Sequence, residues 1–170
     1  AKVQYCKMSN GELMPTVAQY LREGAKYPHL KMVFEIKTHK NNERNAKVVD
    51  QVVRLVRELG VQSQVEYISG NYSICKEVLR LDPTAMVQLV GGGKKPADVF
   101  KDGIRGIDYN YKKLYDEDIL SAHELGMTVN VWTLNTVASM MEFMNKGVDL
   151  ITTDEAELGM SVVGRDFVSY

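Results

Sequence analysis

Short apolar runs rich in β-branched residues alternate with segments of helical spacing along most of this chain. Between residues 46 and 59, for example, apolar side chains recur every three or four positions, and Gly60 follows where a helix C-terminal cap belongs. Pro96 and Asn135 stand where two later helices are expected to begin. The runs that predict strands are residues 30–36, 65–69, 85–90, 106–109, 129–133 and 149–152, of which 106–109 is brief.

Strands separated by single helices predict right-handed βαβ units and a parallel sheet, and apolar residues on both strand faces predict a sheet buried on both sides. An open doubly wound sheet and a closed barrel both satisfy this pattern. No glycine-rich dinucleotide fingerprint follows the first strand, which weighs against the open sheet. Polar residues instead recur where strands end, as at the mouth of a (β/α) barrel. They are Glu35, Lys37, Ser69, Asp108, Trp132, Asn135, Thr153 and Asp154.

The length of the chain limits how much of such a barrel it can form. A complete barrel has eight strands and about 250 residues. The chain has 170 residues, with five clear strands and one brief strand. We therefore expect an α/β fold, a parallel (β/α) TIM-type barrel that is incomplete, with about five to six of its eight strands.

Composition and charge exclude several classes of partner. The formal net charge is −1 and no basic arm is present, so no nucleic-acid partner is expected. No apolar run approaches the ~18 residues of a membrane helix, so no transmembrane segment is expected. Cys6 and Cys75 have neither the spacing of a zinc site nor the density of a disulfide scaffold. We predict a soluble protein whose compartment the sequence leaves open.

Four motifs occur in order along the chain and resemble the signatures of one enzyme family. Residues 11–16, Gly-Glu-Leu-Met-Pro-Thr, resemble the segment before the helix that precedes the family's fourth strand. Residues 34–37, Phe-Glu-Ile-Lys, resemble its Glu-Ile-Lys signature on that strand. Residues 129–135, Val-Asn-Val-Trp-Thr-Leu-Asn, and residues 147–155, which contain Gly-Val-Asp-Leu-Ile-Thr-Thr-Asp, resemble its two later signatures. Together the four motifs resemble those of the glycerophosphodiester phosphodiesterase family. The resemblance implies that residues 1–170 are the C-terminal portion of a single barrel domain of this family.

The resemblance also implies that part of the family's chemistry lies outside this sequence. The family carries a His-Arg pair, a Glu-x-Asp and a His-Asp on its first three strands, and no segment here matches them. The two family histidines form the acid/base pair, so we expect this chain alone to be inactive. A further departure is Ser69-Gly70, where the family usually has Ser-Phe, and it changes the expected substrate pocket rather than the family.

Glu35 and Lys37 are the first candidates for chemistry. Glu35 lies in an otherwise apolar strand, and a carboxylate facing a barrel interior must be paired or bound to a cation. The residues alone favour an ion pair with Lys37, two positions along on the same face. The resemblance implies instead that Glu35 is one of three carboxylate ligands of a divalent metal, Mg²⁺ or Ca²⁺. It likewise matches Lys37 to a catalytic, phosphate-contacting lysine. We expect metal binding to be weak or absent here, because the other ligands are missing.

Four further residues are candidates for substrate contacts. By resemblance Trp132 forms an apolar wall against the glycerol carbons, although a core or rim aromatic fits the sequence equally well. His39 follows Lys37 closely and is either an acid/base group or a solvated loop residue. Ser69 ends a strand, and Asn135 is favoured as a helix cap over a substrate ligand.

The function predicted from these residues is that of a phosphoric diester hydrolase. The resemblance implies hydrolysis of a small-molecule glycerophosphodiester to glycerol 3-phosphate and an alcohol, in lipid and glycerol metabolism. A non-catalytic, self-associating partial-barrel module is the first alternative, and an unrelated phosphate-binding barrel enzyme is the second. We expect the chain to form a homo-oligomer or to associate with the missing N-terminal part, because an incomplete barrel leaves open strand edges. The parent protein is expected to be either exported, to the periplasm, or cytoplasmic.

Overall fold

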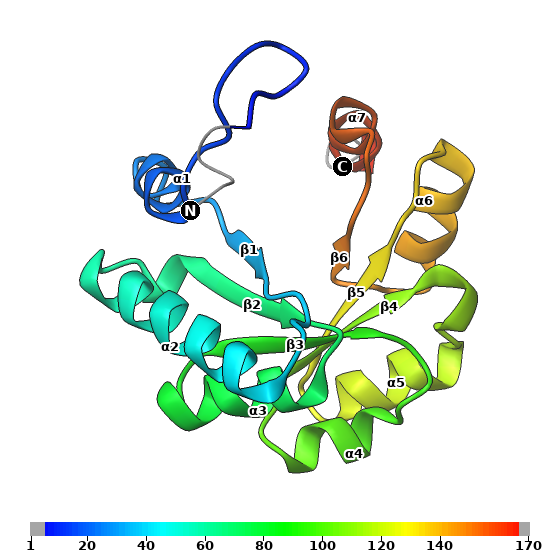
Figure 1. Cartoon of the computed structure of the whole chain (residues 1–170). Helices are drawn as coiled ribbons and strands as arrows, with labels where there is room; N and C mark the ends of the chain where they lie inside the picture. The colour runs from blue at the N-terminus through cyan, green and yellow to red at the C-terminus, as the bar shows by residue number, and fades with distance from the viewer. Residues whose placement is uncertain (1–5, 167–170) are drawn as a thin grey trace.

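The chain folds into six parallel strands that curve into half of a (β/α) barrel (Figure 1). The computed structural model describes residues 6–166. The strands are β1 (Met32–Glu35), β2 (Val65–Ser69), β3 (Met86–Gly91), β4 (Gly106–Asn110), β5 (Thr128–Trp132) and β6 (Leu150–Ile151). Each pairs with the next in chain order, so the sheet runs β1-β2-β3-β4-β5-β6 with β1 and β6 at its two edges. The expected fold class, an incomplete TIM-type barrel, is confirmed.

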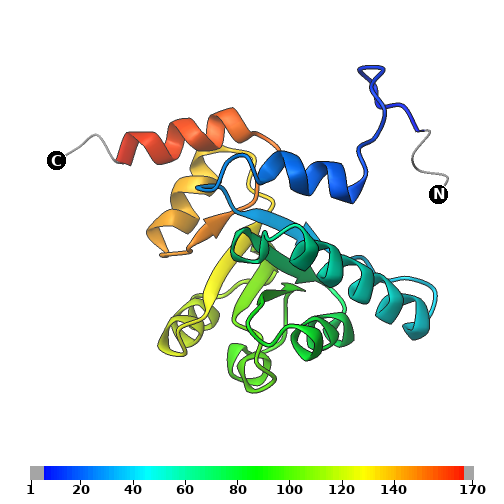
Figure 2. The ribbon, with the colours of Figure 1, turned by 90° about the vertical axis from the view of Figure 1, so that its left-hand side faces the viewer.

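Helices connect the strands and cover the outer face of the sheet (Figures 1 and 2). The α-helices are α1 (Val17–Gly24), α2 (Asn42–Glu58), α3 (Tyr72–Leu81), α4 (Pro96–Lys101), α5 (Asp116–Glu124), α6 (Val137–Asn145) and α7 (Ala156–Asp166). Two short 3₁₀ helices, η2 (Gln62–Gln64) and η3 (Tyr111–Lys113), precede β2 and follow β4. One helix after each strand gives the right-handed crossover that parallel neighbours require.

The helix limits follow from local chemistry. The Asn41 side chain caps α2 by accepting a hydrogen bond from the Arg44 N–H, at 2.8 Å. Gly60 follows α2 with a positive φ of 68°, which a glycine adopts without strain. Pro96 occupies the first turn of α4, where its missing N–H leaves no hydrogen bond unmade. Gly60 and Pro96 agree with the helix end and the helix start expected from the sequence, whereas no cap was predicted at Asn41.

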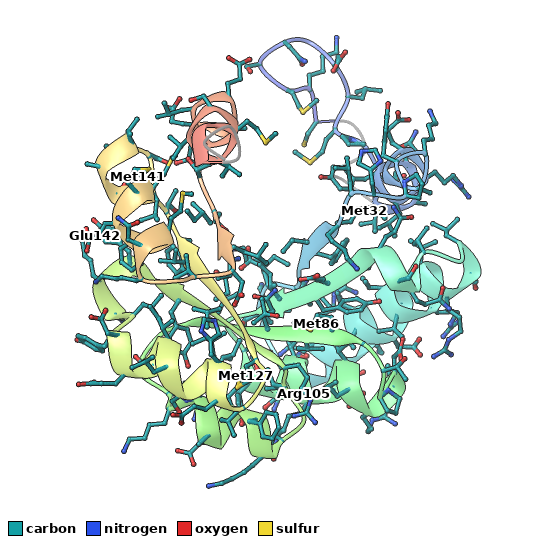
Figure 3. All side chains as sticks on the ribbon, turned by 180° about the vertical axis from the view of Figure 1, so that it is seen from behind. Met32, Met86, Arg105, Met127, Met141 and Glu142 are labelled. Atoms are coloured by element: carbon teal, nitrogen blue, oxygen red, sulfur yellow. The ribbon has the colours of Figure 1, made fainter. Side chains whose placement is uncertain are left out.

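The hydrophobic core lies between the sheet and the outer helices. Outward-facing strand residues such as Tyr67, Ile107 and Val129 are 3% exposed or less. Met32 of β1 faces outward in the same way and packs beside α1 (Figure 3). The inner face differs from the expectation of a sheet buried on both sides, because Val33 there is 47% exposed. The six strands form an open half-barrel, which leaves this face uncovered at the β1 edge. Farther into the sheet the inner face carries the buried polar residues Gln88, Asp108 and Asn130.

Two strand expectations need correction. Residues 106–109 were expected to form a brief strand, whereas β4 has five residues and pairs along its length with both β3 and β5. The shortest strand in the described part of the chain is β6, with two residues. It lies at the edge of the sheet and pairs with β5 alone, through Leu150 and Ile151.

Candidate active site

A cavity of about 420 Å³ occupies the inside of the half-barrel at the carboxyl ends of its strands. All six strands contribute to it, either directly or through the residues that follow them. Parallel strands end at one rim, so residues distant in sequence meet there. The lining residues are Val33, Glu35, Lys37, Ile68, Val90, Asp108, Trp132, Thr133 and Thr152. Glu35, Lys37 and Trp132 therefore share one cavity, as expected from their strand-end positions.

Glu35 and Lys37 form an ion pair across the first edge of this cavity. The Lys37 Nζ lies 2.6 Å from Glu35 Oε1. The two side chains project to the same side because they are two residues apart in extended backbone. Their exposed fractions are 33% for Glu35 and 76% for Lys37, so water screens the pair and its net contribution to stability is below about 1 kcal/mol. A pair this exposed leaves the ammonium available to an anion entering the cavity.

Trp132 and Asp108 lie together on the opposite side of the cavity, on neighbouring strands. The register of β4 and β5 pairs Asn110 with Trp132, and the indole Nε1–H donates to the main-chain oxygen of Asp108 at 3.0 Å. This bond satisfies the polar edge of the indole and fixes the ring beside the carboxyl group. A rigid aromatic surface and a carboxyl group therefore border the same space.

Asp108 is the buried acid of the site. Its side chain alternates with those of Ile107 and Tyr109, which face the outer helices, and the residue is 3% exposed. Its Oδ1 has no hydrogen-bond partner in the described structure. Burial first, and then the negative charge of Glu35, raise the pKa of the Asp108 carboxyl from 3.8 to about 7. Asp108 was among the strand-end polar residues of the sequence, but no role was predicted for it.

The remaining candidates have structural contacts instead. Ser69 is buried, and its hydroxyl donates to the Ile36 carbonyl oxygen at 2.6 Å, which ties β2 to the end of β1. His39 does not line the cavity, and its Nδ1 lies 2.8 Å from the Lys37 carbonyl oxygen. The main-chain N–H of His39 donates to Asn45 of α2, so the loop after β1 is held to that helix.

Asn135 was expected to cap α6, and this is wrong. Thr136 is the N-cap, and its hydroxyl accepts from the Ser139 N–H at 3.2 Å. The Asn135 amide instead donates to Asp154 Oδ2 at 2.8 Å, and its side-chain oxygen accepts from the Asp154 N–H and the Thr153 hydroxyl. Asn135 thus joins the segment after β5 to the segment after β6. Adjacent Asn and Thr are both good capping residues, so the sequence did not separate them.

The carboxyl groups at the cavity do not by themselves form a site for a divalent metal. Within residues 6–166, no group of three or more His, Cys, Asp or Glu side chains is arranged to hold a metal ion. Glu35 is already engaged by Lys37, and Asp108 is the other acid that lines the cavity. A hard cation such as Mg²⁺ or Ca²⁺ takes six or more oxygen ligands. The residues described here do not form such a set, and the role of Glu35 as a metal ligand stays a prediction.

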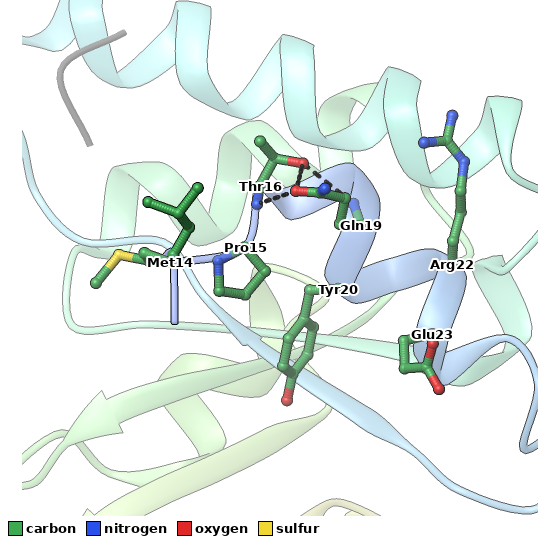
Figure 4. Close-up of a pocket in the computed structure, with 8 residues that line it drawn as sticks. Met14, Pro15, Thr16, Gln19, Tyr20, Arg22 and Glu23 are labelled. Carbon is green, nitrogen blue, oxygen red and sulfur yellow. Dashed lines mark hydrogen bonds between the residues drawn. The ribbon is translucent and has the colours of Figure 1, made fainter. Parts of the chain in front are cut away.

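A second hollow, of about 840 Å³, lies along the outside of α1 (Figure 4). It is formed by residues 13–23 of one continuous segment and no strand end reaches it. The labelled Thr16 and Gln19 are occupied by the capping box at the start of α1, in which the Thr16 N–H donates to Gln19 Oε1 at 2.9 Å. Of these two hollows, only the cavity of the half-barrel lies where strand ends converge and is lined by a lysine together with carboxyl groups, so it is the candidate active site.

Comparison with known proteins identifies the family. The model of the glycerophosphoryl diester phosphodiesterase family matches residues 1–158. A glycerophosphodiester phosphodiesterase from Parabacteroides distasonis is 34% identical, with a TM-score of 0.92 over 97% of this chain and 71% of its own.

More distant structures share the fold. A glycerophosphodiester phosphodiesterase from Agrobacterium tumefaciens is 19% identical, with a TM-score of 0.69 over 89% of this chain and 63% of its own. A phosphodiesterase from Oleispira antarctica, solved with its product sn-glycerol-3-phosphate, is 14% identical, with a TM-score of 0.76 over 88% of this chain and 61% of its own. The chain thus spans only part of each relative, and among curated proteins none matches. With a family model covering residues 1–158, the chain belongs to the glycerophosphoryl diester phosphodiesterase family.

Proposed function

We propose that the cavity inside the half-barrel is the substrate-binding part of a glycerophosphodiester phosphodiesterase site, with water as the second substrate and glycerol 3-phosphate and an alcohol as products. The observation that supports this most strongly is that Glu35, Lys37 and Trp132, which match the family's signatures, line one cavity at the strand ends. The Oleispira antarctica relative, a phosphodiesterase, binds sn-glycerol-3-phosphate as its product. Residues 1–170 are then the C-terminal portion of one barrel domain.

Each residue has a distinct part in this proposal. The Lys37 ammonium, 76% exposed and held at the rim by Glu35, contacts a phosphoryl oxygen and offsets the negative charge that grows there during hydrolysis. The Trp132 ring, fixed by its bond to Asp108, packs against the carbons of the glycerol group. Glu35 orients Lys37 at a distance of 2.6 Å. None of these groups moves the protons that hydrolysis requires.

Turnover by this chain alone is therefore expected to be absent or trace. The sequence contains no match to the family's histidine pair, and loss of an acid or base costs about 10²–10⁴-fold in rate. The measurement is hydrolysis of glycerophosphocholine with Mg²⁺ or Ca²⁺ added. Turnover of about 1–10³ s⁻¹ would contradict the expectation and would make His39 the first residue to test as a replacement.

Phosphate binding tests the proposal without any need for turnover. The ligand is propyl phosphate, and the readout is the emission of Trp132, the only tryptophan in the chain. Replacement of Lys37 by Ala should weaken binding about tenfold or more, because a charge-assisted contact to phosphate is lost. Lys40→Ala is the matched control, since Lys40 is exposed and does not line the cavity. Equal affinity in the wild type and both variants would contradict the assignment of Lys37.

Self-association is the second candidate, and exposed apolar residues on both sides of the open edge favour it. Leu13, in the segment before α1, and Tyr20 of α1 are 58% and 60% exposed, and Met160 of α7, which lines a hollow with residues of β6, is 74% exposed. Figure 1 shows α1 and α7 facing each other across the unpaired edges of the half-barrel. Light scattering at micromolar concentration should give a mass well above the 19.2 kDa of one chain. A well-folded monomer without a bound peptide would contradict this.

No helix in the described part of the chain is both long enough and apolar enough to cross a membrane.

A further inference from the structure

Asp108 presents an unused buried acceptor beside the surface assigned to the glycerol carbons. The residue is 3% exposed, lines the cavity, and has a carboxyl oxygen without a hydrogen-bond partner in the described structure. A buried carboxyl oxygen without a donor costs free energy, on the order of 1–3 kcal/mol. Native structures keep such groups rarely, and a ligand that supplies the missing donor is one reason for keeping them.

The described side chains around Asp108 leave its Oδ1 without a donor and indicate which kind of ligand suits it. Lys37 is already paired with Glu35, and no lysine or arginine forms an ion pair with Asp108 among the described residues. Val90 is paired with Asp108 in the β3–β4 register, and Ile68 lines the same cavity. On the other side Asn130 is paired with Asp108 in the β4–β5 register, and its amide donates to the Thr152 hydroxyl instead. A molecule bound in the cavity that Asp108 lines can supply the missing donor.

The position of Trp132 indicates the shape of that molecule. Its indole N–H donates to the main-chain oxygen of Asp108. The ring and the carboxyl group, on the neighbouring strands β5 and β4, therefore border the same space. An aromatic face and a carboxylate together suit a polyol, whose carbons pack on the ring while its hydroxyls donate to the oxygens. The cavity, of about 420 Å³, accommodates a molecule the size of a phosphorylated glycerol.

We propose that Asp108 is a specificity-determining residue that accepts hydrogen bonds from the free hydroxyls of the glycerol group. This rests on the proposed function, because it places the phosphoryl group at Lys37 and the hydroxyls at Asp108. A site built around a buried hydrogen-bond acceptor discriminates strongly against an analogue without the hydroxyl, since the acceptor is then left without a partner. Asp108 thus selects glycerol phosphates over simple alkyl phosphates.

The test compares two ligands that differ only in these hydroxyls, sn-glycerol-3-phosphate and propyl phosphate. Both are titrated into the whole chain with Trp132 emission as the readout. Wild-type protein should bind glycerol phosphate about tenfold more tightly or better. Asp108→Ala should bind the two ligands with equal affinity. Asp108→Asn keeps the shape of the side chain and serves as the second variant if Asp108→Ala does not fold. Its ratio of the two affinities should lie between those of the wild type and of Asp108→Ala. Asp98→Asn, on exposed α4, is the matched control and should keep the wild-type ratio.

The outcomes separate this inference from the proposed function. If wild-type protein binds both ligands equally while Lys37→Ala weakens both, the role of Asp108 is refuted and phosphate binding by Lys37 stands. A preference for glycerol phosphate that stays at the wild-type ratio in both Asp108 variants also refutes it. If the preference appears only with Ca²⁺ or Mg²⁺ and vanishes with EDTA, a cation rather than the Asp108 carboxylate binds the hydroxyls and the inference is wrong. Absence of any phosphate binding overturns both proposals.

Discussion

Neutralising Asp108 should stabilise the protein at alkaline pH but not at acidic pH. The perturbation is Asp108→Asn, which removes the charge and keeps the side-chain shape. Burial and the charge of Glu35 raise the pKa of Asp108 from 3.8 to about 7 in the folded protein. At about 1.4 kcal/mol for each unit of pKa, protonated Asp108 stabilises the fold by about 4 kcal/mol relative to the ionised form.

The direction of the pH dependence follows from this raised pKa. The folded protein binds the Asp108 proton more tightly than the unfolded chain does, so the stabilisation of the fold by protonated Asp108 is fully present below about pH 4. It is lost as the pH rises through about 7. Wild-type stability relative to Asp108→Asn should therefore fall by about 3 kcal/mol between pH 4.5 and pH 8, and level off above pH 8.

The assay is urea unfolding of both proteins in EDTA at several pH values, with the emission of Trp132 as the probe. The difference between the two proteins isolates Asp108 from acids with lowered pKa, such as Glu77 and Asp98. Asp98→Asn, at an exposed position of α4, should show no comparable change. A flat difference between wild type and Asp108→Asn across this range would mean that Asp108 is ionised and hydrated in the folded protein, and the description of a buried acid would be wrong.

Two further variants test the packing and capping. A Cβ on Gly106 would lie 2.6 Å from Cγ of the fully buried Gln88, so Gly106→Ala should lower the free energy of unfolding by about 1–3 kcal/mol. A Cβ on Gly70 would lie 3.8 Å from its nearest neighbour, so Gly70→Ala should change the free energy of unfolding by less than about 0.5 kcal/mol. Equal effects of the two substitutions in chemical denaturation would refute the close contact. Asn41→Ala removes the cap of α2 and should cost about 1 kcal/mol in the same measurement, and an unchanged midpoint would show that α2 does not depend on this bond.

The periodic pattern was enough to predict the fold, but not every detail of the site. Strand-end position alone predicted that Glu35, Lys37 and Trp132 share a cavity, because parallel strands bring their carboxyl ends to one rim. Asp108 shows the limit of this reasoning. Its burial and its unpartnered oxygen depend on the neighbouring β3 and β5, which sequence spacing does not specify. Asn135 was misread for a related reason, since its partners lie 18 and 19 residues away, beyond β6.

Chemical-shift mapping of sn-glycerol-3-phosphate on the isotopically labelled chain tests the central claim most directly, because it locates the ligand without requiring turnover. The account predicts that shifts concentrate on the cavity of the half-barrel, at Lys37 and Asp108 and at the single indole N–H resonance of Trp132. Residues 13–23, which form the hollow along α1, serve as the internal control and should not shift. Shifts confined to residues 13–23, or no saturable shifts at millimolar ligand, would contradict the assignment of the cavity as the glycerophosphodiester site.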